Sequence, residues 1–399
     1  MSVILTDGLC EDLKMKIYYF DFVAKGGVHT TFNSAMIEVL NKVYPDNDGI
    51  ILHSEKEHGK IVKEKCTTEI ELKSRKLVDK IKYRKIKDLL NSIAIFFYIL
   101  FANNKNIFFV GLAFPFSVNS IYFFSKLFNK RLFLCLHGEL QYLLDCDVSI
   151  FDKKSKRYFS KMKFAFSHHN KDLSYVVLGK TIYESAKHLF NSKNKVIVLN
   201  HPAIFKENKS KHELHKPIVI AQIGQALKRK GSKHLFELAN LLKDEIKNGN
   251  VVLKILGICG DEFPEKKSEL VRYSSKFLSE EELSDQIEQI DFSIQLTTDS
   301  TCTAIASGTL IDSLIYEKPV LGLMSSYLDY YTEGLQKKLV CSSIEDLANL
   351  IKTLLQSCSQ DEYKKYVEAT IDMKKYFSVE YNAELFRNEL GRWKYMSQF

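Results

Sequence analysis

The sequence predicts an α/β protein with two domains, each built on a parallel sheet flanked by helices. Short apolar strands alternate with helices along most of the chain, which is the pattern of such sheets. The length of 399 residues exceeds the size at which a single hydrophobic core keeps growing. A polar, lysine-rich stretch in the middle has the composition of an interdomain linker. We therefore expect domains at 1–204 and 217–379, a linker at 205–216 and a final amphipathic helix at 380–399.

The amino half begins with a predicted strand at Lys16–Val23, followed by Gly26 and Gly27 and a helix from about Thr31 to Lys42. Two glycines at this turn would let the backbone approach a ligand closely, and a tight turn without a ligand is the alternative. The charged stretch at 56–88 predicts mostly helix. Apolar runs predict further strands at 49–54, 107–112, 131–136, 175–178 and 195–199, with helices at 114–128 and 181–190.

The strand at 131–136 leads directly into His137, Gly138 and Glu139. Open α/β sheets bind their ligands at the carboxyl ends of parallel strands, so His137 is a candidate site residue. The alternative is a polar residue that simply ends a strand.

The carboxyl half opens with a buried strand at 218–223 and a basic loop from Gly224 to Gly231. Lys228, Arg229 and Lys230 stand together before a helix at 232–247, which favours phosphate binding, and a solvated loop is the alternative. Further strands are expected at 251–256, 271–277 and 291–296.

The stretch from Leu296 to Leu323 gives the strongest local prediction, a strand, a small-residue turn, a helix and a second strand. Its turn is Ser307, Gly308 and Thr309, and the helix runs from 310 to 316. Backbone N–H groups and the helix dipole favour an anion at this helix start. Asp312, one turn further along, is placed to accept hydrogen bonds from sugar hydroxyls. An ordinary turn with a solvated Asp is the alternative.

Charge and cysteine content limit the cellular compartments and binding partners that we expect for this protein. The net charge of +8 favours anionic ligands or a membrane surface over nucleic acid. Eight cysteines without any CxxC pair predict neither a zinc site nor a disulfide framework, which fits a reducing cytosol. The first fifteen residues do not read as a signal peptide. The most apolar window, 93–102, has about half the length of a membrane-spanning helix.

Taken in order, these features resemble the GT-B glycosyltransferases. Within that fold the chain is similar to nucleotide-sugar transferases of bacterial surface polysaccharide assembly, meaning O-antigen (lipopolysaccharide) or capsule enzymes of the group 1, or family 4, type. The resemblance covers nearly the whole length and is strongest over 218–323. It implies two Rossmann-like domains that face each other across a cleft, with the last helix packing back on the amino-terminal domain.

The resemblance also assigns roles to individual residues. Gly26 and Gly27 match the glycine loop that faces the donor phosphates and the acceptor, and His137 matches the His that contacts the donor sugar. Gly224 and Lys230 match the Gly-Arg…Lys-Gly segment that binds the donor diphosphate. The Arg of that segment is Gln225 here, so Arg229 or Lys228 would have to supply the second cation.

The two acids of the family, eight residues apart, fall on Ala304 and Asp312. Asp312 keeps the acid that holds the ribose hydroxyls, whereas the acid near the donor sugar is missing. The turn Ser307, Gly308 and Thr309 is closer to the phosphate turn of inverting GT-B enzymes. Retention and inversion therefore both stay open.

The expected reaction is a hexosyl transfer from a UDP- or GDP-sugar to a saccharide acceptor. Fixed N–H groups with Lys or Arg can stabilise the leaving diphosphate, so we expect neither a cofactor nor a metal. An inverting reaction needs a base for the acceptor hydroxyl, and His137, His29 and Glu139 are the candidates. In a retaining reaction the leaving phosphate could take that proton.

Two other classes of function fit the same residues. One is a sugar-nucleotide epimerase-like GT-B enzyme that needs no separate acceptor. The other is a non-catalytic subunit that binds nucleotides or saccharides, because Gln225 and Ala304 replace charged residues of the family.

We expect the acceptor to be lipid-linked or otherwise close to the membrane. The protein would then be cytoplasmic, with its amino domain on the inner face of the plasma membrane. The prediction depends on a mixture of cations and aromatic residues between 80 and 131, and buried Phe residues of the core are the alternative. The members of this mixture are Lys82, Arg84, Lys85, Lys87, Lys126 and Lys130 with Phe96, Phe97, Phe114, Phe116, Phe123 and Phe124.

Overall fold

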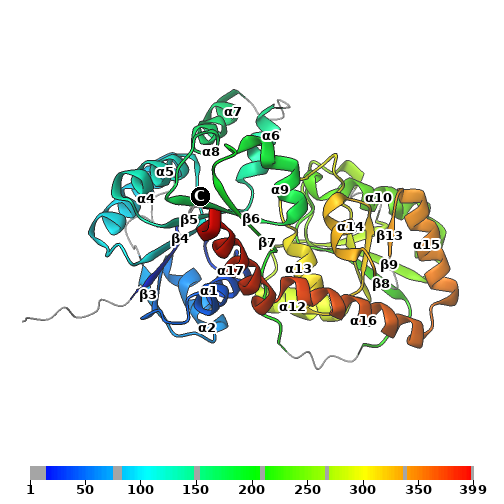
Figure 1. The fold of residues 1–399 in the computed structure, drawn as a ribbon. Helices are drawn as coiled ribbons and strands as arrows, with labels where there is room; N and C mark the ends of the chain where they lie inside the picture. Colours follow the sequence, from blue (N-terminus) through cyan, green and yellow to red (C-terminus); the bar gives the residue numbers. More distant parts are fainter. Residues whose placement is uncertain are drawn as a thin grey trace, which may run out of the picture. The chain divides into compact units, whose positions relative to one another are not determined.

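The computed structural model describes residues 15–74, 83–147, 153–206, 212–265, 269–335 and 339–396 (Figure 1). Two sheets and the helices around them make up this part of the chain. One sheet has seven strands in the order β3-β2-β1-β4-β5-β6-β7, and the other has six in the order β10-β9-β8-β11-β12-β13. The α/β class predicted from the alternating strands and helices is confirmed.

The first sheet and its helices occupy the amino-terminal half. The strands are β1 (Ile17–Asp21), β2 (Ile50–Ser54), β3 (Ile70–Ser74), β4 (Ile107–Leu112), β5 (Leu132–Leu136), β6 (Leu173–Leu178) and β7 (Lys195–Leu199). The helices are α1 (Thr30–Val43), α2 (Lys56–Lys65), α4 (Arg84–Phe101), α5 (Pro115–Phe128), α6 (Glu139–Asp147), α7 (Lys153–Phe159), α8 (Lys163–Ser167) and α9 (Lys180–Ala186), with short 3₁₀ turns at Ser160–Met162 and Lys187–Leu189.

The second sheet and its helices follow. The strands are β8 (Ile218–Ile223), β9 (Val251–Ile258), β10 (Val271–Ser274), β11 (Phe292–Gln295), β12 (Val320–Leu323) and β13 (Val340–Cys341). The helices are the 3₁₀ turn η3 (Lys228–Lys230), α10 (Ser232–Leu241), α11 (Lys243–Lys247), α12 (Glu280–Glu288), α13 (Gly308–Ile315), α14 (Ser326–Thr332), α15 (Ile344–Ser357), α16 (Gln360–Phe377) and α17 (Val379–Met396).

Central strands of both sheets are continuous apolar runs because both of their faces are buried. Every residue of β2, β5 and β6 is buried. The strand β1 pairs in parallel with β2 and β4, and β8 pairs in parallel with β9 and β11. Parallel strands covered on both sides need apolar residues at successive positions, which is why the sequence shows runs instead of alternation.

Strand order reverses at one place in each sheet. In the first sheet, β1 and β4 are neighbours although two other strands separate them in sequence, and β8 and β11 have the same relation in the second. Open parallel sheets bind ligands outside the carboxyl ends of the strands at this switch point. Candidate residues are therefore sought after β1 and β4, and after β8 and β11.

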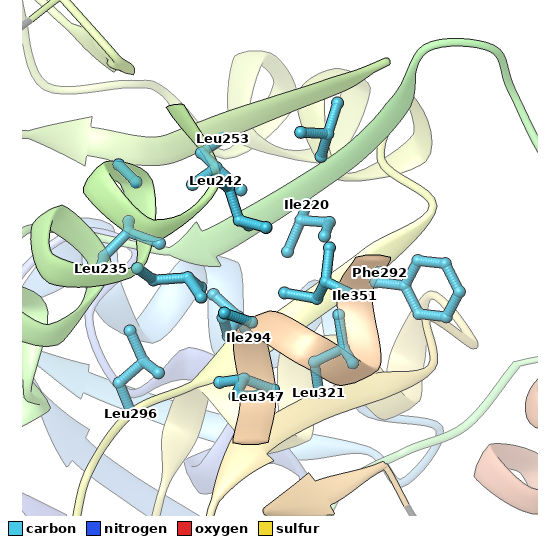
Figure 2. Close-up of a cluster of buried hydrophobic side chains, with 14 of the residues drawn as sticks. Ile220, Leu235, Leu242, Leu253, Phe292, Ile294, Leu296, Leu321, Leu347 and Ile351 are labelled. Atoms are coloured by element: carbon cyan, nitrogen blue, oxygen red, sulfur yellow. The ribbon is translucent and has the colours of Figure 1, made fainter. Parts of the chain in front are cut away.

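The core of the second sheet lies between its strands and the helices α10 and α15. Figure 2 shows Ile220, Leu253 and Ile294 from the strands meeting Leu235 from α10 and Ile351 from α15. Their side chains are at most 1% exposed. Burying such a side chain fully stabilises the fold by roughly 1.5–3 kcal/mol, so this cluster holds β8 and β11 firmly in place beneath the switch point.

Contacts divide the chain into two compact units. The first holds Met1–Cys135, Lys161–Val176 and Asn191–Val196, and the second holds Leu136–Ser160, Val177–Phe190 and Ile197–Phe399. The predicted boundaries at 205–216 and the predicted return of the last helix to the amino-terminal domain stay predictions. Residues 207–211 of the predicted linker lie outside the described residues. At its far end, the His215 ring lies 2.8 Å from a carboxylate oxygen of Asp291.

The prediction of mostly helix over 56–88 is wrong in part. The helix α2 ends at Lys65, and β3 then runs over Ile70–Ser74 as an edge strand that pairs in parallel with β2. Only Ile70 of this strand is buried, so its polar sequence lacks the apolar run that marks a central strand. Residues 75–82, Lys82 among them, lie outside the described residues.

Two cations that were predicted to lie on the surface are buried. Lys87 is 7% exposed and Lys130 is 5% exposed. The Lys130 ammonium donates hydrogen bonds to the carbonyl of Ala102 and to Asn104, just after α4 ends. Lysines commonly satisfy the last carbonyls of a helix in this way, and this one is used for structure.

Candidate functional site

The switch point of the second sheet is shaped by a close approach of two backbone segments. Gly224 follows β8 with φ of 81°, and its N–H donates to the carbonyl of Leu256. A Cβ atom on Gly257 would lie 2.6 Å from the carbonyl carbon of Gly224. Side chains are excluded at both positions, because one lacks space and the other needs a left-handed backbone conformation. The loop after β8 is therefore held directly against β9.

A second glycine brings the other end of this loop against β11. Gly231 adopts φ of 68°, and a Cβ atom there would lie 1.9 Å from the carbonyl oxygen of Leu296. The next residue, Ser232, begins α10, and its hydroxyl accepts a hydrogen bond from the N–H of Leu227. The loop from 224 to 231 is thus closed on itself and held between the ends of β9 and β11.

The loop places the Lys230 ammonium over Gly224. A Cβ atom on Gly224 would lie 3.0 Å from Lys230 Nζ. Burial lowers the pKa of Lys230 below its usual 10.5; the Asp312 carboxylate opposes this change and Arg229 adds to it. Lys228 and Arg229 are exposed. Of the three cations predicted here, Lys230 is the one that is largely withdrawn from water, and an anion would stabilise its charged form.

The turn before α13 lies close to Gly224 and therefore to the loop that carries Lys230. The side-chain oxygen of Ser307 accepts a hydrogen bond from the N–H of Leu310 and so caps α13. The hydroxyls of Ser307 and Thr309 both donate to Oε1 of Gln295, the last residue of β11. Around Gly308, a Cβ atom would meet nothing within 4 Å, so the space in front of the helix start is open.

Four of the predicted binding residues are brought together by these contacts. The Thr309 methyl group lies 4.0 Å from a Cβ atom built on Gly224, and Lys230 and Asp312 interact through their charges. A half-buried cation, a half-buried acid and a helix start therefore share one place at the carboxyl ends of β8 and β11. Such a place is suited to a phosphate joined to a hydroxyl-bearing group.

The segment that leads into this turn is fixed by a residue that the sequence analysis missed. Oε1 of Gln141, in α6, accepts hydrogen bonds from the N–H groups of Thr303 and Ala304, at 3.0 and 2.9 Å. Both partners belong to the second compact unit. Ala304 is 1% exposed, so no acidic side chain stands at the position where the family has one. A single Gln gives no sequence signal for this role, because its partners are 162 and 163 residues away.

Glu139 holds the turn that carries His137. One oxygen of its carboxylate accepts the N–H groups of His137 and Gly138, at 2.7 and 3.0 Å, and the residue is 3% exposed. The His137 ring lies edge-on to His201, with ring centroids 6.3 Å apart. These contacts support a positioning role for Glu139. The catalytic roles of His137 and Glu139 stay predictions.

The switch point of the first sheet carries a buried polar network. Asn33 joins Asp21, at the end of β1, to His58 in α2. Its side-chain nitrogen lies 2.7 Å from Asp21 Oδ2 and 2.8 Å from His58 Nε2, and its oxygen accepts from the Tyr19 hydroxyl. Each of these four side chains is at most 1% exposed. Because the Asn33 nitrogen donates to His58 Nε2, the ring proton sits on Nδ1.

This network fixes the predicted glycine turn. Nδ1 of His58 lies 2.9 Å from the carbonyl of Gly26, to which it donates, and the Gly26 N–H donates to the Glu55 carboxylate. Gly26 has φ of 51°, and Gly27 accepts a hydrogen bond from the N–H of Thr30. The sequence analysis found the two glycines but not their supports, because Asp21, Asn33 and His58 are far apart in the sequence.

His29 lies where this turn enters α1. It has φ of 61° and stands at the N-cap position, and its carbonyl accepts from the N–H of Asn33. Burial lowers the pKa of His29 from 6.5; Asp21 opposes this change and His58 adds to it. A His with a lowered pKa is neutral at pH 7, which is the form that can accept a proton.

Within the described ranges, no group of three or more His, Cys, Asp and Glu side chains is arranged to hold a metal ion. The expectation that the reaction needs no metal stays a prediction.

Comparisons with known proteins identify the fold. No protein-family model matches the chain, and neither does any curated protein sequence. Solved structures do match, and three of them show the relation. HepE of Anabaena in complex with UDP-glucose is 12% identical, with a TM-score of 0.62 over 95% of this chain and 100% of that one. TarM matches with 12% identity and a TM-score of 0.62, over 94% and 98% of the two chains. A glycosyltransferase of Rickettsia africae matches with 14% identity and a TM-score of 0.60, over 95% and 99%. The chain therefore has the GT-B fold, as the sequence resemblance implied.

Loss of the His58 ring should loosen the glycine turn. We expect His58→Ala to speed amide hydrogen exchange in a peptide covering 24–32 by about tenfold, because local opening loses its main support. Exchange detected by mass spectrometry measures this directly. His58→Asn should restore much of the protection, since the Asn amide nitrogen can replace Nδ1. The exposed His188 provides the control, and equal exchange in the His58→Ala and His188→Ala variants would contradict the assigned support.

A methyl group at Gly224 should disturb Lys230. Gly224→Ala combines a strained backbone with a Cβ atom 3.0 Å from Nζ, so we expect binding of a nucleoside diphosphate to weaken about tenfold. Gly249 has a similar φ of 74° with nothing within 4 Å of its Cβ position. Gly249→Ala should lose stability to a similar degree but keep its affinity. Isothermal calorimetry on both variants measures nucleotide affinity, and so distinguishes an effect of backbone strain from an effect of the contact with Lys230.

Proposed function

We propose that this protein is a glycosyltransferase that moves a hexosyl group from a UDP- or GDP-sugar to a saccharide acceptor. The observation that carries the proposal is the meeting of Lys230, Gly224, Thr309 and Asp312 at the carboxyl ends of β8 and β11. In this proposal the Lys230 ammonium and the start of α13 bind the diphosphate. Asp312 accepts hydrogen bonds from the ribose hydroxyls. Ser307, Gly308, Thr309 and Arg229 complete the phosphate site.

Transfer breaks the bond between the sugar C1 atom and the terminal phosphate oxygen, so negative charge develops on the leaving diphosphate. A desolvated cation close to that oxygen stabilises the charge more strongly than a solvated one. Lys230 fits this requirement because it is largely withdrawn from water. We propose that these groups suffice without a metal ion or other cofactor.

The proton of the acceptor hydroxyl needs an acceptor of its own. In an inverting reaction we propose His29 or His137 as the base. His29 has the stronger support, because burial lowers its pKa and keeps its ring neutral at pH 7. In a retaining reaction the leaving phosphate would take this proton. His137 would then position the donor sugar, with Glu139 holding the turn that carries it.

The structural relatives support this class of reaction. HepE was crystallised with UDP and glucose and with UDP-glucose, and TarM of S. aureus with UDP and a glycosylated glycerol. We propose a role in bacterial surface polysaccharide assembly, in the cytoplasm at the inner face of the plasma membrane. The acceptor would be a lipid-linked saccharide. Among the described residues, no helix is both long and apolar enough to cross a bilayer.

A non-catalytic sugar-nucleotide-binding subunit is the second candidate. The buried Ala304 favours it, since this residue places no carboxylate near the donor sugar. Under this candidate the nucleotide binds, but no sugar is transferred or released.

One experiment separates the two candidates. Thermal unfolding is followed with UDP, GDP and their sugars, because a ligand that binds only the folded state raises the melting temperature. The stabilising donor is then supplied in labelled form, with and without a saccharide acceptor. A glycosyltransferase gives labelled product, whereas a binding subunit gives stabilisation alone. If no nucleotide raises the melting temperature, both candidates fail.

Lys230→Ala should weaken nucleotide binding about tenfold or more, because a charge-assisted hydrogen bond to phosphate contributes roughly 1.5–3 kcal/mol. The wild-type affinity should also depend on pH. Burial lowers the pKa of free Lys230, and bound phosphate would raise it, so affinity is full below the lowered pKa and falls as pH rises through it. Calorimetry in two buffers would show proton uptake in that range.

Two variants control this result. Lys230→Arg stays charged at alkaline pH, so it should remove the pH dependence even where its overall affinity is lower. Lys233 is exposed at the start of α10, and Lys233→Ala should bind as the wild type does. Unchanged affinity in Lys230→Ala would place the phosphate elsewhere.

Asp312→Asn should weaken the binding of the sugar donor and of the free nucleotide alike, by about tenfold. The reason is that a neutral amide accepts hydrogen bonds from ribose less strongly than a carboxylate does. Calorimetry with both ligands measures the effect. Asp285 is exposed on α12, and Asp285→Asn is the matched control. Equal affinities in Asp312→Asn and the control would show that Asp312 is merely solvated.

A further inference from the structure

The helix α4 exposes a stripe of large apolar side chains along its length. The stripe consists of Ile86, Leu89, Ile93, Phe97, Leu100 and Phe101, spaced three or four residues apart except at its end. Phe97 is 51% exposed and Phe101 is 80% exposed, and their rings stack with centroids 6.3 Å apart. Monomeric soluble proteins rarely expose a continuous apolar surface of this kind unless it binds something.

The orientation of α4 is fixed from its other side. Asp88 is fully buried, and its carboxylate accepts the N–H groups of Phe116 and Ser117 at the start of α5. Further along, the ring of Phe96 packs against Phe124 and Phe128 of α5. Figure 1 shows the two helices side by side. With this face held against α5, α4 cannot turn its exposed stripe inward.

The charges around α4 have one sign. Residues 84–131 contain seven Lys and Arg residues and a single acid, Asp88, which is buried in the contact with α5. Lys85 and Lys126 are exposed. Phe123 of α5 is 53% exposed and stacks on Phe164 of α8. Lys163 of α8 and Lys161 of the 3₁₀ turn before it are also exposed. The surface of these three helices is therefore aromatic and cationic and has no exposed acid within 84–131.

We infer that the α4 stripe is a docking surface for an anionic lipid bilayer. The helix has 18 residues and is roughly 27 Å long, and it lies in the plane of the headgroups with its apolar stripe among the acyl chains. The exposed lysines contact anionic headgroups. This inference rests on the proposed function, because docking to a membrane would bring the enzyme to an acceptor that is carried on a lipid.

The charge pattern favours a bilayer over a second copy of the chain. A symmetric dimer through this face would place the same patch against itself. Lys85 and Lys126 would then face cations of the same patch on the second copy, and residues 84–131 include no exposed acid. An anionic membrane meets the apolar and the cationic parts of the surface together.

Vesicle flotation tests the inference on the full-length protein. The wild type should float with phosphatidylcholine vesicles that contain phosphatidylglycerol at low salt, and less with phosphatidylcholine alone or at high salt. The double variant Phe97→Glu, Phe101→Glu should reduce the bound fraction about tenfold, because charged groups cannot enter the acyl region. A wild type that stays soluble with anionic vesicles at low salt overturns the inference.

The matched control changes two exposed apolar residues of the second unit, Phe277→Glu and Leu241→Glu, which are 72% and 40% exposed in the wild type. Equal loss of flotation in both double variants overturns the α4 assignment. If the α4 variant does not fold, Lys85→Glu, Lys126→Glu should abolish the preference for anionic vesicles.

Light scattering tests the alternative occupant. A wild-type dimer that dissociates in the α4 variant, without flotation of either, would assign this face to a second copy and overturn the bilayer. Nucleotide binding is measured without vesicles, so a failure of the proposed function is seen separately from a failure of this inference.

Discussion

The site after the second sheet depends on one constraint, the contact of the 224–231 loop with the ends of β9 and β11. Gly257 and Gly231 permit it, since a Cβ atom at either position would overlap backbone atoms of the neighbouring segment. The contact places Lys230 over Gly224 and leaves its side chain half-buried, whereas Lys228 of the same loop is exposed. The position of the Lys230 ammonium and its burial thus have the same origin, a backbone packing that only glycine allows.

Withdrawing a cation partly from water without a full partner, as at the half-buried Lys230, costs stability, and such costs are commonly retained at sites that bind the missing charge. Asp312 compensates the Lys230 charge in part, because its effect on the pKa of Lys230 is smaller than that of burial. The same acid is the residue that we assign to ribose. Binding of a nucleoside diphosphate would therefore complete the charge balance of Lys230 and give Asp312 hydroxyl partners together, which couples recognition of the phosphate to recognition of the sugar.

Sequence alone predicted what is encoded locally. The strands around β1 and β8, the loop at Gly224 and the turn at Ser307 all lie within short motifs whose apolar runs and glycines are visible without a structure. It missed the supports, because each joins residues that only the fold brings together. His58 reaches Gly26 from another helix, and Gln141 reaches Ala304 from 163 residues away. The edge strand β3 was missed because an edge position needs no apolar run. Lys130 was wrongly placed on the surface because composition does not distinguish an exposed lysine from one that bonds to a carbonyl at a helix end.

Lysine is used in three physically different ways in this chain, and burial distinguishes them. Lys130 is buried and bonded to protein carbonyl groups, so its charge serves the fold. Lys85 and Lys126 are exposed to solvent, where charge acts over a distance and is screened by salt. Lys230 is largely withdrawn from water, with an acid too weakly coupled to offset its burial, and this is the arrangement that makes a bound anion favourable. The net charge of +8 therefore says less about ligands than the depth at which each ammonium group lies.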